Sequence, residues 1–460
     1  METKIVALSE LCKISGRVGW KGYTVDDLRE DGPLVIGAND IDSNHQLDLK
    51  EVKHISREKY EESPEIMIDK YDILIVKVGS TIGKVAIVDQ DLGEACINPN
   101  TVLLKNCKIN PFYVYYTLIS SYGQSFLLNN SSASAQPALN QTTLKEMPIH
   151  LPADENWINN ITTSLNRINN KIKLNNRINR ELEAMAKTLY DYWFVQFDFP
   201  NEQGKPYKSS GSKMVYNAEL KREIPEGWEV KTIAKWIKND KSGDWGKETE
   251  EGNYQLKVSC VRGADLNGLN GNGELKPPTR FILENNSNKL LENHDLIVEI
   301  SGGSPTQSTG RLAFINEETL QRFPNPLICS NFCKALTLKE EKYLYNFVYQ
   351  WNRIYDNGVL FGWEGKTSGI KNLLFESFVT NHKEAYPKSE IVEKFYDLVK
   401  PIHSQKQKNL IQNQQLSELR DWLLPMLMNG QVTIKEVEEK LSMAAEPSGE
   451  YKKGKNMSEE

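Results

Sequence analysis

Long apolar runs are absent from this sequence. Because a membrane-spanning helix needs about 20 consecutive apolar residues, we expect no membrane contact. The first residues, Met1–Val6, also lack the extended apolar segment of a secretory signal. The sequence therefore predicts a cytoplasmic protein.

Metal-binding patterns are missing too. The chain has 6 Cys and 6 His. No two cysteines form a Cys-x-x-Cys pair, and the histidines are scattered, which argues against a zinc site. A framework of disulfides is equally unexpected for a cytoplasmic chain. We therefore expect reduced thiols and no bound metal ion.

A strong positive charge is also absent, since the formal net charge is -6 and the pI about 5.8. A simple nucleic-acid-binding domain is often strongly basic. A basic stripe can nevertheless lie on an acidic molecule. If this chain binds nucleic acid, we expect other subunits to supply part of the contact with phosphates.

The usual catalytic motifs are incomplete. Gly79–Lys84 is one residue too short for a phosphate-binding P-loop and lacks the following Ser or Thr. Asn98–Asn100 lacks the second Pro and the aromatic residue of an amino-methyltransferase tetrapeptide. Gly302–Pro305 follows an apolar strand but opens no helix, as a dinucleotide-binding turn would. The acid–Lys pattern of Glu274–Lys276 resembles a nuclease site but is common by chance. We expect no catalytic residue and a chain that is not an enzyme.

The sequence does contain one long-range repeat, in which segments recur in the same order about 225 residues later. The offset drifts along the chain, as loop insertions between preserved core elements would produce. The matching segments are Gly37–Ile41 with Arg262–Leu266, Asp72–Val76 with Asp295–Glu299, Gly79–Lys84 with Gly303–Arg311, and Tyr113–Tyr116 with Tyr343–Asn346.

Two similar domains follow from this repeat, at residues 1–152 and 226–386. Short apolar strands alternate with loops rich in Gly, Asn and Ser, and each domain has one aromatic helix, near Tyr113–Ile119 and Tyr343–Trp351. This pattern predicts the α+β class, with a mostly antiparallel, curled sheet in each domain.

Two long helices are predicted at 153–197 and 387–430. A connector at 198–225 joins the first helix to the second domain. Apolar residues spaced alternately by three and four form a heptad seam in each helix. About 38 residues without Pro or Gly would give a helix of roughly 57 Å. The polar tail at 431–460 is expected to be disordered.

Four asparagines occupy the two seams: Asn175 and Asn179, and about 234 residues later Asn409 and Asn413. A buried seam Asn fixes the register of a helix pair, because slippage would leave its amide unpaired. If the helices run antiparallel and are centred on each other, Asn175 faces Asn409 and Asn179 lies opposite Lys406. The alternative is two independent amphipathic helices, each packed on its own domain.

The most specific segments lie in and near the helices. They are Glu181–Val195, Phe197–Pro200, Gly204–Gly211, Ile224–Trp228 and Glu418–Gly430. With two globular domains alternating with two similar helices, this sequence resembles the specificity subunit of type I restriction–modification enzymes, a bacterial defence system. The resemblance covers about residues 1–435 and is strongest in the helices.

The resemblance implies that each domain is a target-recognition domain reading one half of a split, asymmetric site in double-stranded DNA. The two antiparallel helices, in a circular repeat with pseudo-two-fold symmetry, would act as spacers and as the seat for two methyltransferase subunits. Restriction (translocase) subunits would join that core. S-adenosylmethionine would then belong to the methyltransferase partner, and ATP and Mg to the restriction partner, with no cofactor in this chain.

DNA contacts are expected from polar loops, because Arg and Lys read guanine, Asn and Gln read adenine, and Ser and Lys contact phosphates. The alternative for each residue is a solvated side chain on an ordinary turn. The candidates are Arg17, Lys21, Lys77, Ser80, Lys84, Gln136, Asn140 and Gln141 in the first domain, and Lys247, Arg262, Gln307, Ser308, Arg311, Lys366 and Lys371 in the second.

Contacts with partner subunits are expected from the aromatic residues at the C-terminal ends of the two helices: Trp193, Phe194, Phe197 and Trp422. Such clusters favour interfaces. The alternative is that they pack against their own recognition domains. For the whole chain, the competing functions are a coiled-coil assembly scaffold that reads no sequence and a fused enzyme, which the incomplete motifs disfavour.

Overall fold

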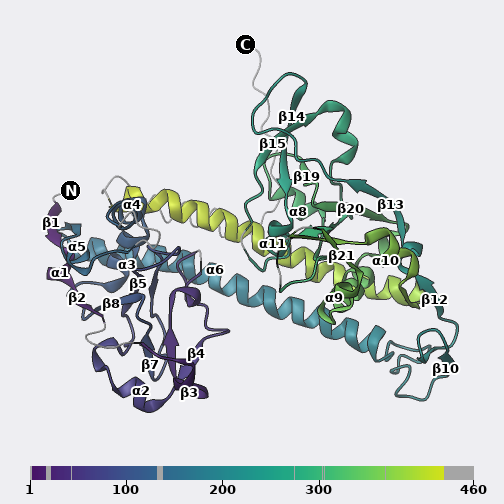
Figure 1. The fold of residues 1–460 in the computed structure, drawn as a ribbon, viewed down its shortest axis with the longest axis horizontal. Coiled ribbons are helices and arrows are strands. Elements are labelled where there is room, and N and C mark those ends of the chain that lie inside the picture. The colour runs from purple at the N-terminus through teal and green to yellow at the C-terminus, as the bar shows by residue number, and fades with distance from the viewer. Residues whose placement is uncertain are drawn as a thin grey trace, which may run out of the picture. The chain divides into compact units, whose positions relative to one another are not determined.

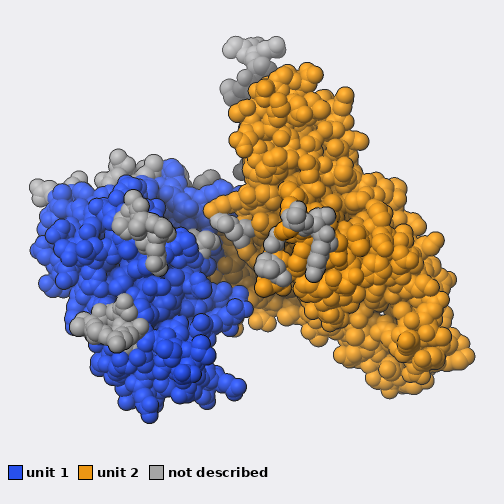
Figure 2. Space-filling model, in the orientation of Figure 1, with its two compact units in different colours: residues 1–172, 414–460 blue, residues 173–413 orange. Residues whose placement is uncertain are grey.

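The computed structural model describes residues 3–16, 22–42, 44–131, 138–273, 275–302, 304, 306–367 and 369–428. Internal contacts divide the chain into two compact units. Unit 1 comprises Met1–Ile172 and Gln414–Glu460, and unit 2 comprises Lys173–Asn413 (Figure 2). Each unit combines one α+β domain with a segment of each of two long helices, α6 (Glu155–Tyr190) and α11 (Ser389–Met428) (Figure 1).

The described residues of the unit 1 domain form three small sheets. A four-stranded antiparallel sheet has the order β2 (Lys13–Ser15), β8 (Thr101–Lys105), β5 (Ile73–Val76), β6 (Val85–Ile87). A three-stranded sheet has the order β4 (Lys53–Ile55), β3 (Leu28–Ile36), β7 (Ala95–Ile97), with β3 and β7 parallel. Finally, β1 (Thr3–Ala7) pairs with β9 (Pro148–Pro152).

The domain of unit 2 repeats this pairing pattern. Its four-stranded sheet has the order β13 (Ile237–Ser242), β20 (Cys333–Leu338), β16 (Leu296–Glu299), β18 (Leu312–Phe314). Its three-stranded sheet has the order β15 (Thr279–Leu283), β14 (Tyr254–Val261), β19 (Leu327–Cys329), again with one parallel pair, β14 with β19. Strand β12 (Glu229–Thr232) pairs with β23 (Lys383–Tyr386). The prediction of two similar α+β domains with mostly antiparallel sheets is confirmed.

Unit 2 also has strands beyond this shared pattern. Two of them, β10 (Met214–Asn217) and β11 (Arg222–Pro225), form a hairpin in the connector. Three others form a small sheet in the order β17 (Ser301–Gly302), β22 (Ile370–Leu373), β21 (Glu364–Thr367). Of the matching sequence segments, Gly303–Arg311 is longer than its counterpart Gly79–Lys84, and this insertion contributes to the drift in the repeat offset.

Short helices complete both domains. In unit 1 they are α1 (Leu8–Leu11), α2 (Arg57–Glu61), α3 (Pro111–Ile119), α4 (Ser121–Asn129) and α5 (Gln141–Lys145). In unit 2 they are α7 (Leu266–Leu269), α8 (Glu317–Gln321), α9 (Leu344–Asp356) and α10 (Phe375–Asn381). The aromatic helices predicted from sequence are α3 and α9, and both bury their rings in the domain core.

Short Asp-mediated turns account for the most exact sequence matches between the domains. The Asp40 carboxylate accepts a hydrogen bond from the backbone N–H of Gly37 (2.8 Å), and Asp265 accepts one from Arg262 (2.9 Å). Such a turn needs a short acceptor three residues after the donor. The carboxylates of Asp72 and Asp295 close equivalent turns just before β5 and β16.

The two long helices pair antiparallel. In unit 2, Asn409 donates to Asn179 Oδ1 (2.8 Å), and one turn further along α6, Glu183 meets Lys406 (2.6 Å). As the residue numbers rise along α6, those of the contacting residues on α11 fall, so the two helices run antiparallel. In unit 1, Arg420 approaches Asn169 Oδ1 (3.4 Å), in agreement with this direction. Because each seam contacts the other helix, the alternative of two independent helices is excluded.

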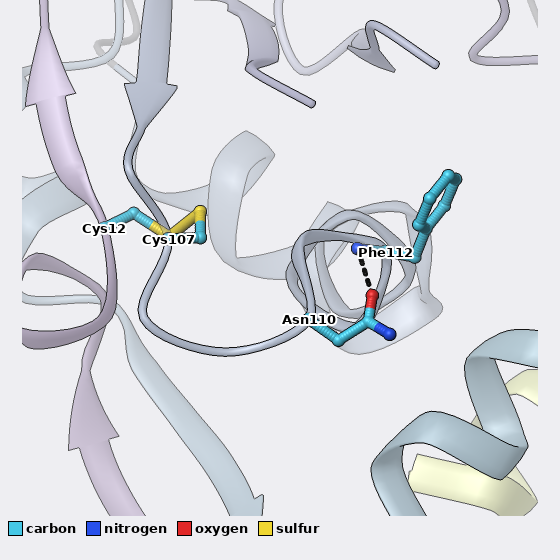
Figure 3. The surroundings of a disulfide bond; sticks show 4 residues. All are labelled: Cys12, Cys107, Asn110 and Phe112. Atoms are coloured by element: carbon cyan, nitrogen blue, oxygen red, sulfur yellow. Dashed lines mark hydrogen bonds between the residues drawn. A yellow bond between two sulfur atoms is a disulfide. The ribbon is translucent and has the colours of Figure 1, made fainter. Parts of the chain in front are cut away.

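One expectation about cysteine is wrong. Cys12 and Cys107 form a disulfide that joins the segment before β2 to the segment after β8 (Figure 3). Cys96, Cys260, Cys329 and Cys333 are free and buried. Burial raises the pKa of the Cys96 thiol to about 12, so it stays protonated at neutral pH. Among the described helices, none has the length and apolar character needed to cross a membrane.

Candidate nucleic-acid interface and subunit contacts

Four of the predicted DNA contacts cannot be placed by their side chains. Arg17, Lys21 and Gln136 lie outside the described residues. Lys366 belongs to β21, but its side chain is also outside the described part of the chain. The other eleven candidates are described below.

In unit 1 the structure brings two predicted loops together. Leu139 N–H donates to the carbonyl of Lys77 (2.8 Å), and Val78 bridges to Ala138. The loop of Lys77, Ser80 and Lys84 therefore lies beside the loop of Asn140 and Gln141, although about 60 residues separate them in sequence. We call these residues, 77–84 and 138–141, the loop pair.

Within the loop pair, the side chains differ in how firmly the protein holds them. Ser80 is exposed on a turn whose glycines, Gly79 and Gly83, have φ of 104° and 87°, a conformation that favours glycine. Lys84 Nζ donates to the carbonyl of Ile41 (2.6 Å) and forms no ion pair with a carboxylate among the described residues. Asn140 caps α5 by accepting from Thr142 N–H (2.9 Å).

In unit 2 the predicted cations pair with carboxylates. Arg311 makes a two-pronged ion pair with Glu299, at 2.8 and 2.7 Å. These hydrogen bonds raise the pKa of the Arg311 guanidinium, whereas burial lowers it. The remaining pairs are Arg262 with Asp265, Lys247 with Glu251, and Lys371 with Glu364. These pairs reduce the local positive charge.

The last two candidates of unit 2 differ in exposure. Gln307 is exposed, and its carbonyl accepts from Lys371 Nζ (3.2 Å). Ser308 is 5% exposed, and its hydroxyl donates to the carbonyl of Thr309 (2.8 Å). Ser308 therefore supports its own loop, and its contact with DNA stays a prediction. Among the described residues, no group of three His, Cys, Asp or Glu side chains gathers as a metal site would require.

Three of the four predicted partner contacts lie in the core instead. Trp193, Phe194 and Phe197 are 4%, 6% and 3% exposed. Phe194 packs edge-on against Phe395 (5.0 Å between ring centroids), and Phe197 packs against Trp228 (5.4 Å). The interface prediction for these three is wrong, because the start of α11 and the connector cover the rings. Trp422, the fourth, is 42% exposed.

An apolar stripe on α6 was missed by the sequence analysis. Leu174, Ile178 and Met185 are 50%, 37% and 60% exposed. Their spacings of four and seven residues place them on one face, away from the buried seam. The signal in the sequence was a second set of apolar residues, spaced by four and seven, beside the buried seam. We call these three residues the outer stripe.

The seam asparagines lie between the helices in a register that differs from the predicted one. Asn175 donates to Asn413 Oδ1 (2.9 Å) and to Gln412 Oε1 (2.8 Å), and Asn179 faces Asn409. Asn175 opposite Asn409 is therefore wrong by about one helical turn. The prediction assumed that the two seams are centred on each other, whereas the observed contacts shift one helix along the other. That these amides set the register stays a prediction.

Comparison with known proteins gives consistent results. A family model described as the type I restriction modification DNA specificity domain matches residues 2–184. The type I restriction enzyme MjaIX specificity subunit of Methanocaldococcus jannaschii is 27% identical over 332 residues, covering 71% of this chain and 70% of that protein. The HindI specificity subunit of Haemophilus influenzae is 22% identical over 482 residues, covering 90% and 99%.

The fold also has a solved counterpart. The crystal structure of a type I restriction–modification S subunit from M. genitalium aligns with a TM-score of 0.53 at 14% identity, covering 93% of this chain and 96% of that one. At this identity the likeness speaks for the fold, which matches the repeated domains and paired helices described above. The family match and the curated relatives agree with this fold, and this chain is similar to the type I restriction–modification specificity subunits.

Proposed function

We propose that this chain is the non-catalytic DNA-reading subunit of its complex and recognises a two-part, asymmetric target in double-stranded DNA. Each α+β domain reads one half, and the helix pair fixes the number of unread base pairs between them. One turn of DNA spans about 34 Å. A helix of 36 residues is long enough, at roughly 1.5 Å per residue, to separate readers by more than one turn.

The observation that carries this proposal is the repeat of one sheet topology with different loop chemistry. Both domains have the same strand pairing, down to the single parallel pair. Their corresponding loops present different residues, such as Lys84 in one and Arg311 in the other. Two readers of one fold with different surfaces suit two different half-sites.

The loop pair is the best candidate for DNA contact in unit 1. It gathers Lys77, Ser80, Lys84 and Asn140 from distant parts of the chain, and these residue types contact phosphates and base edges. In unit 2 the cations Arg262, Arg311 and Lys371 need either to exchange their carboxylate partners for phosphates or to contact DNA as neutralised pairs, whereas Gln307 is exposed and uncharged. The domains would then contribute unequally to the salt dependence of binding.

The outer stripe supports the proposal that partner subunits dock on the helices. An exposed stripe of Leu174, Ile178 and Met185 matches the narrow apolar seam that a partner helix requires. We assign it to a methyltransferase subunit, of which two would bind, with restriction subunits joining this core. S-adenosylmethionine, ATP and Mg would be bound by these partners and not by this chain.

Methylation mapping tests the reading function. The chain is expressed with its cognate methyltransferase subunit in a host that lacks both, and methylated bases are mapped by single-molecule sequencing. We expect a two-part asymmetric motif with a fixed gap, and replacement of residues 1–152 by another domain should change one half only. A continuous motif, or the same motif without this chain, would show that it reads no sequence. The chain would then be an assembly scaffold.

Assembly tests the outer stripe. Met185→Glu combined with Ile178→Glu should prevent association with the methyltransferase subunit, measured by light scattering after gel filtration. Ala184→Glu, on an exposed position beside the stripe, is the matched control and should assemble normally. Normal assembly of the stripe variant would move the docking surface elsewhere without affecting the reading proposal.

A further inference from the structure

A small, partly open cavity lies in unit 2 where the end of α6, strand β11, helix α9 and strand β23 meet. Its lining residues are Tyr190, Phe194, Arg222, Trp228, Asn346, Gln350, Arg353, Glu384 and Ala385. The space that it offers to a water molecule is about 10 Å³. One water molecule needs about this much space, so the cavity is too small for an organic ligand.

The charges around the cavity are balanced within the protein. Arg353 donates to both carboxylate oxygens of Glu384, at 3.2 and 3.1 Å. Burial would raise the pKa of Glu384, but His382, Arg353 and Arg222 lower it overall, so the carboxyl is ionised at neutral pH. A second ion is therefore not required here, and a neutral guest fits better than an anion.

Three polar atoms at the cavity find no protein partner among the described residues: Asn346 Oδ1, Gln350 Oε1 and Arg353 Nε. Asn346 is 2% exposed and Gln350 is 4% exposed. The three residues are spaced by four and three on α9, which places them on one face of that helix. Buried polar atoms in native proteins almost always have a hydrogen-bond partner, so these three indicate one.

We propose that this cavity binds one structural water molecule. The two amide oxygens accept the two hydrogens of the water, and the Arg353 Nε–H donates to its oxygen. Buried waters typically make about three hydrogen bonds, which equals the number of atoms left over here. These three bonds would use both hydrogens of the water and one of its two lone pairs.

This water joins the recognition domain to the spacer. Asn346, Gln350 and Arg353 come from α9, whereas Tyr190 and Phe194 come from the end of α6 and its following turn. In unit 1 the hydroxyls of the matching helix α3 and of its C-cap are bonded within that helix, because Thr117 donates to the carbonyl of Tyr113 (2.8 Å) and Ser120 donates to that of Thr117 (2.6 Å). We therefore expect a water at the junction in unit 2 and none at the matching place in unit 1.

A crystal structure of the full chain at high resolution gives the direct test. We expect one well-ordered peak within about 3.2 Å of all three atoms. A cavity with no peak, or one closed by direct bonds between the three side chains, would overturn the proposal.

The sign of a stability change gives a second test. Asn346→Leu with Gln350→Met removes both acceptors while keeping the volume. If water is bound, this change expels it and strands the Arg353 Nε–H, so the unfolding temperature of unit 2 should fall by about 4 °C or more. If no water is bound, replacing two unpaired amides with apolar groups should raise that temperature.

Ala385→Val keeps the proposal testable if the double variant does not fold. The added methyl groups enter the cavity, so they displace a bound water and lower the unfolding temperature, or fill an empty space and raise it. Thr117→Val in unit 1 is the matched control, and it should leave hydrogen exchange of α9 unchanged. A rise in unfolding temperature with Ala385→Val would overturn the proposal.

Discussion

The two recognition domains hold the cation of one corresponding loop in different ways. In unit 1, Lys84 donates to the carbonyl of Ile41 (2.6 Å). In unit 2, Arg311 forms a two-pronged pair with Glu299, a residue that is 5% exposed. Each cation directly precedes a matching strand, β6 or β18, and follows a glycine with positive φ (Gly83, 87°; Gly310, 106°). The fold is thus kept by strands and turns, while polar contacts are free to diverge.

A second difference lies where each aromatic helix meets a long helix. In unit 1 the Tyr116 hydroxyl accepts from Asn169 (2.9 Å), and in unit 2 the Tyr349 hydroxyl pairs with His403 (3.0 Å). Asn169 and His403 occupy matching positions in the two long helices, 234 residues apart. An amide does not titrate, but an imidazole does. The same junction is therefore insensitive to pH in one unit and sensitive in the other.

Removing Arg311 should have the largest effect. Arg311→Ala leaves the buried Glu299 carboxylate unpaired, which costs about 3–5 kcal/mol of unfolding free energy in unit 2. Lys84→Ala, its counterpart, should cost about 1 kcal/mol because it removes one hydrogen bond. Urea unfolding followed by hydrogen exchange in each unit measures both. Adding Glu299→Gln to Arg311→Ala should restore part of the loss, and equal losses in the two units would contradict the comparison.

Loss of the disulfide should affect unit 1 alone. Cys12 and Cys107 are separated by 95 residues, and closing so long a loop stabilises a domain by about 2–4 kcal/mol. Cys12→Ser should therefore lower the unfolding temperature of unit 1 and leave unit 2 unchanged in calorimetry. Dithiothreitol should reproduce this shift in the natural chain and have no further effect on the variant. A shift in unit 2 would show that the disulfide acts beyond its own domain.

Acid should destabilise unit 2 through His403. Burial lowers the pKa of this imidazole to about 4, with Glu183 raising it and Lys406 lowering it. The unfolded chain, with a pKa near 6.5, binds the proton first as pH falls. Stability is therefore complete above about pH 6.5 and decreases toward pH 4, by about 2 kcal/mol at pH 5. His403→Asn copies unit 1 and should abolish this slope in urea titrations at pH 5 and 7. A persistent slope would assign it to another group.

The smallest effect concerns DNA. Lys84→Gln in the assembled complex should reduce the slope of log binding constant against log salt by up to about 1, as the loss of one phosphate contact does. Arg311→Lys keeps the charge beside Glu299 and should leave the slope nearly unchanged. Lys108→Gln, exposed and outside the loop pair, is the control. An unchanged slope for Lys84→Gln would remove this loop from the proposed interface.

The sequence was sufficient for the features that repeat. Asp40 with Asp265 and Asp72 with Asp295 located matching turns, and the heptad seams located α6 and α11. The axial shift between the helices could not be predicted, because a heptad seam shows which face of a helix is buried but not how far the two helices are shifted along each other. Both registers place polar residues opposite Asn175, and the contact with Asn413 was resolved by the structure alone.

Contacts between distant residues were also beyond the sequence. The aromatic rings of Trp193 and Phe194 suit an interface or a core equally well, and only the position of Phe395 decides for the core. The pairing of Arg311 had a visible signal, because Glu299 ends its strand where the other copy has Val76. The disulfide had none, since Cys12 and Cys107 are far apart in sequence.

The sharing of both long helices between the units also determines the order in which the protein can be completed during synthesis. Leu416, Leu423 and Leu424 belong to the core of unit 1, yet the whole of unit 2 is translated before them. At about 5–20 residues per second, the ribosome needs roughly 10–50 s to make the intervening segment. During this time the first domain exposes an unfilled apolar surface, so the domain made first is the domain finished last.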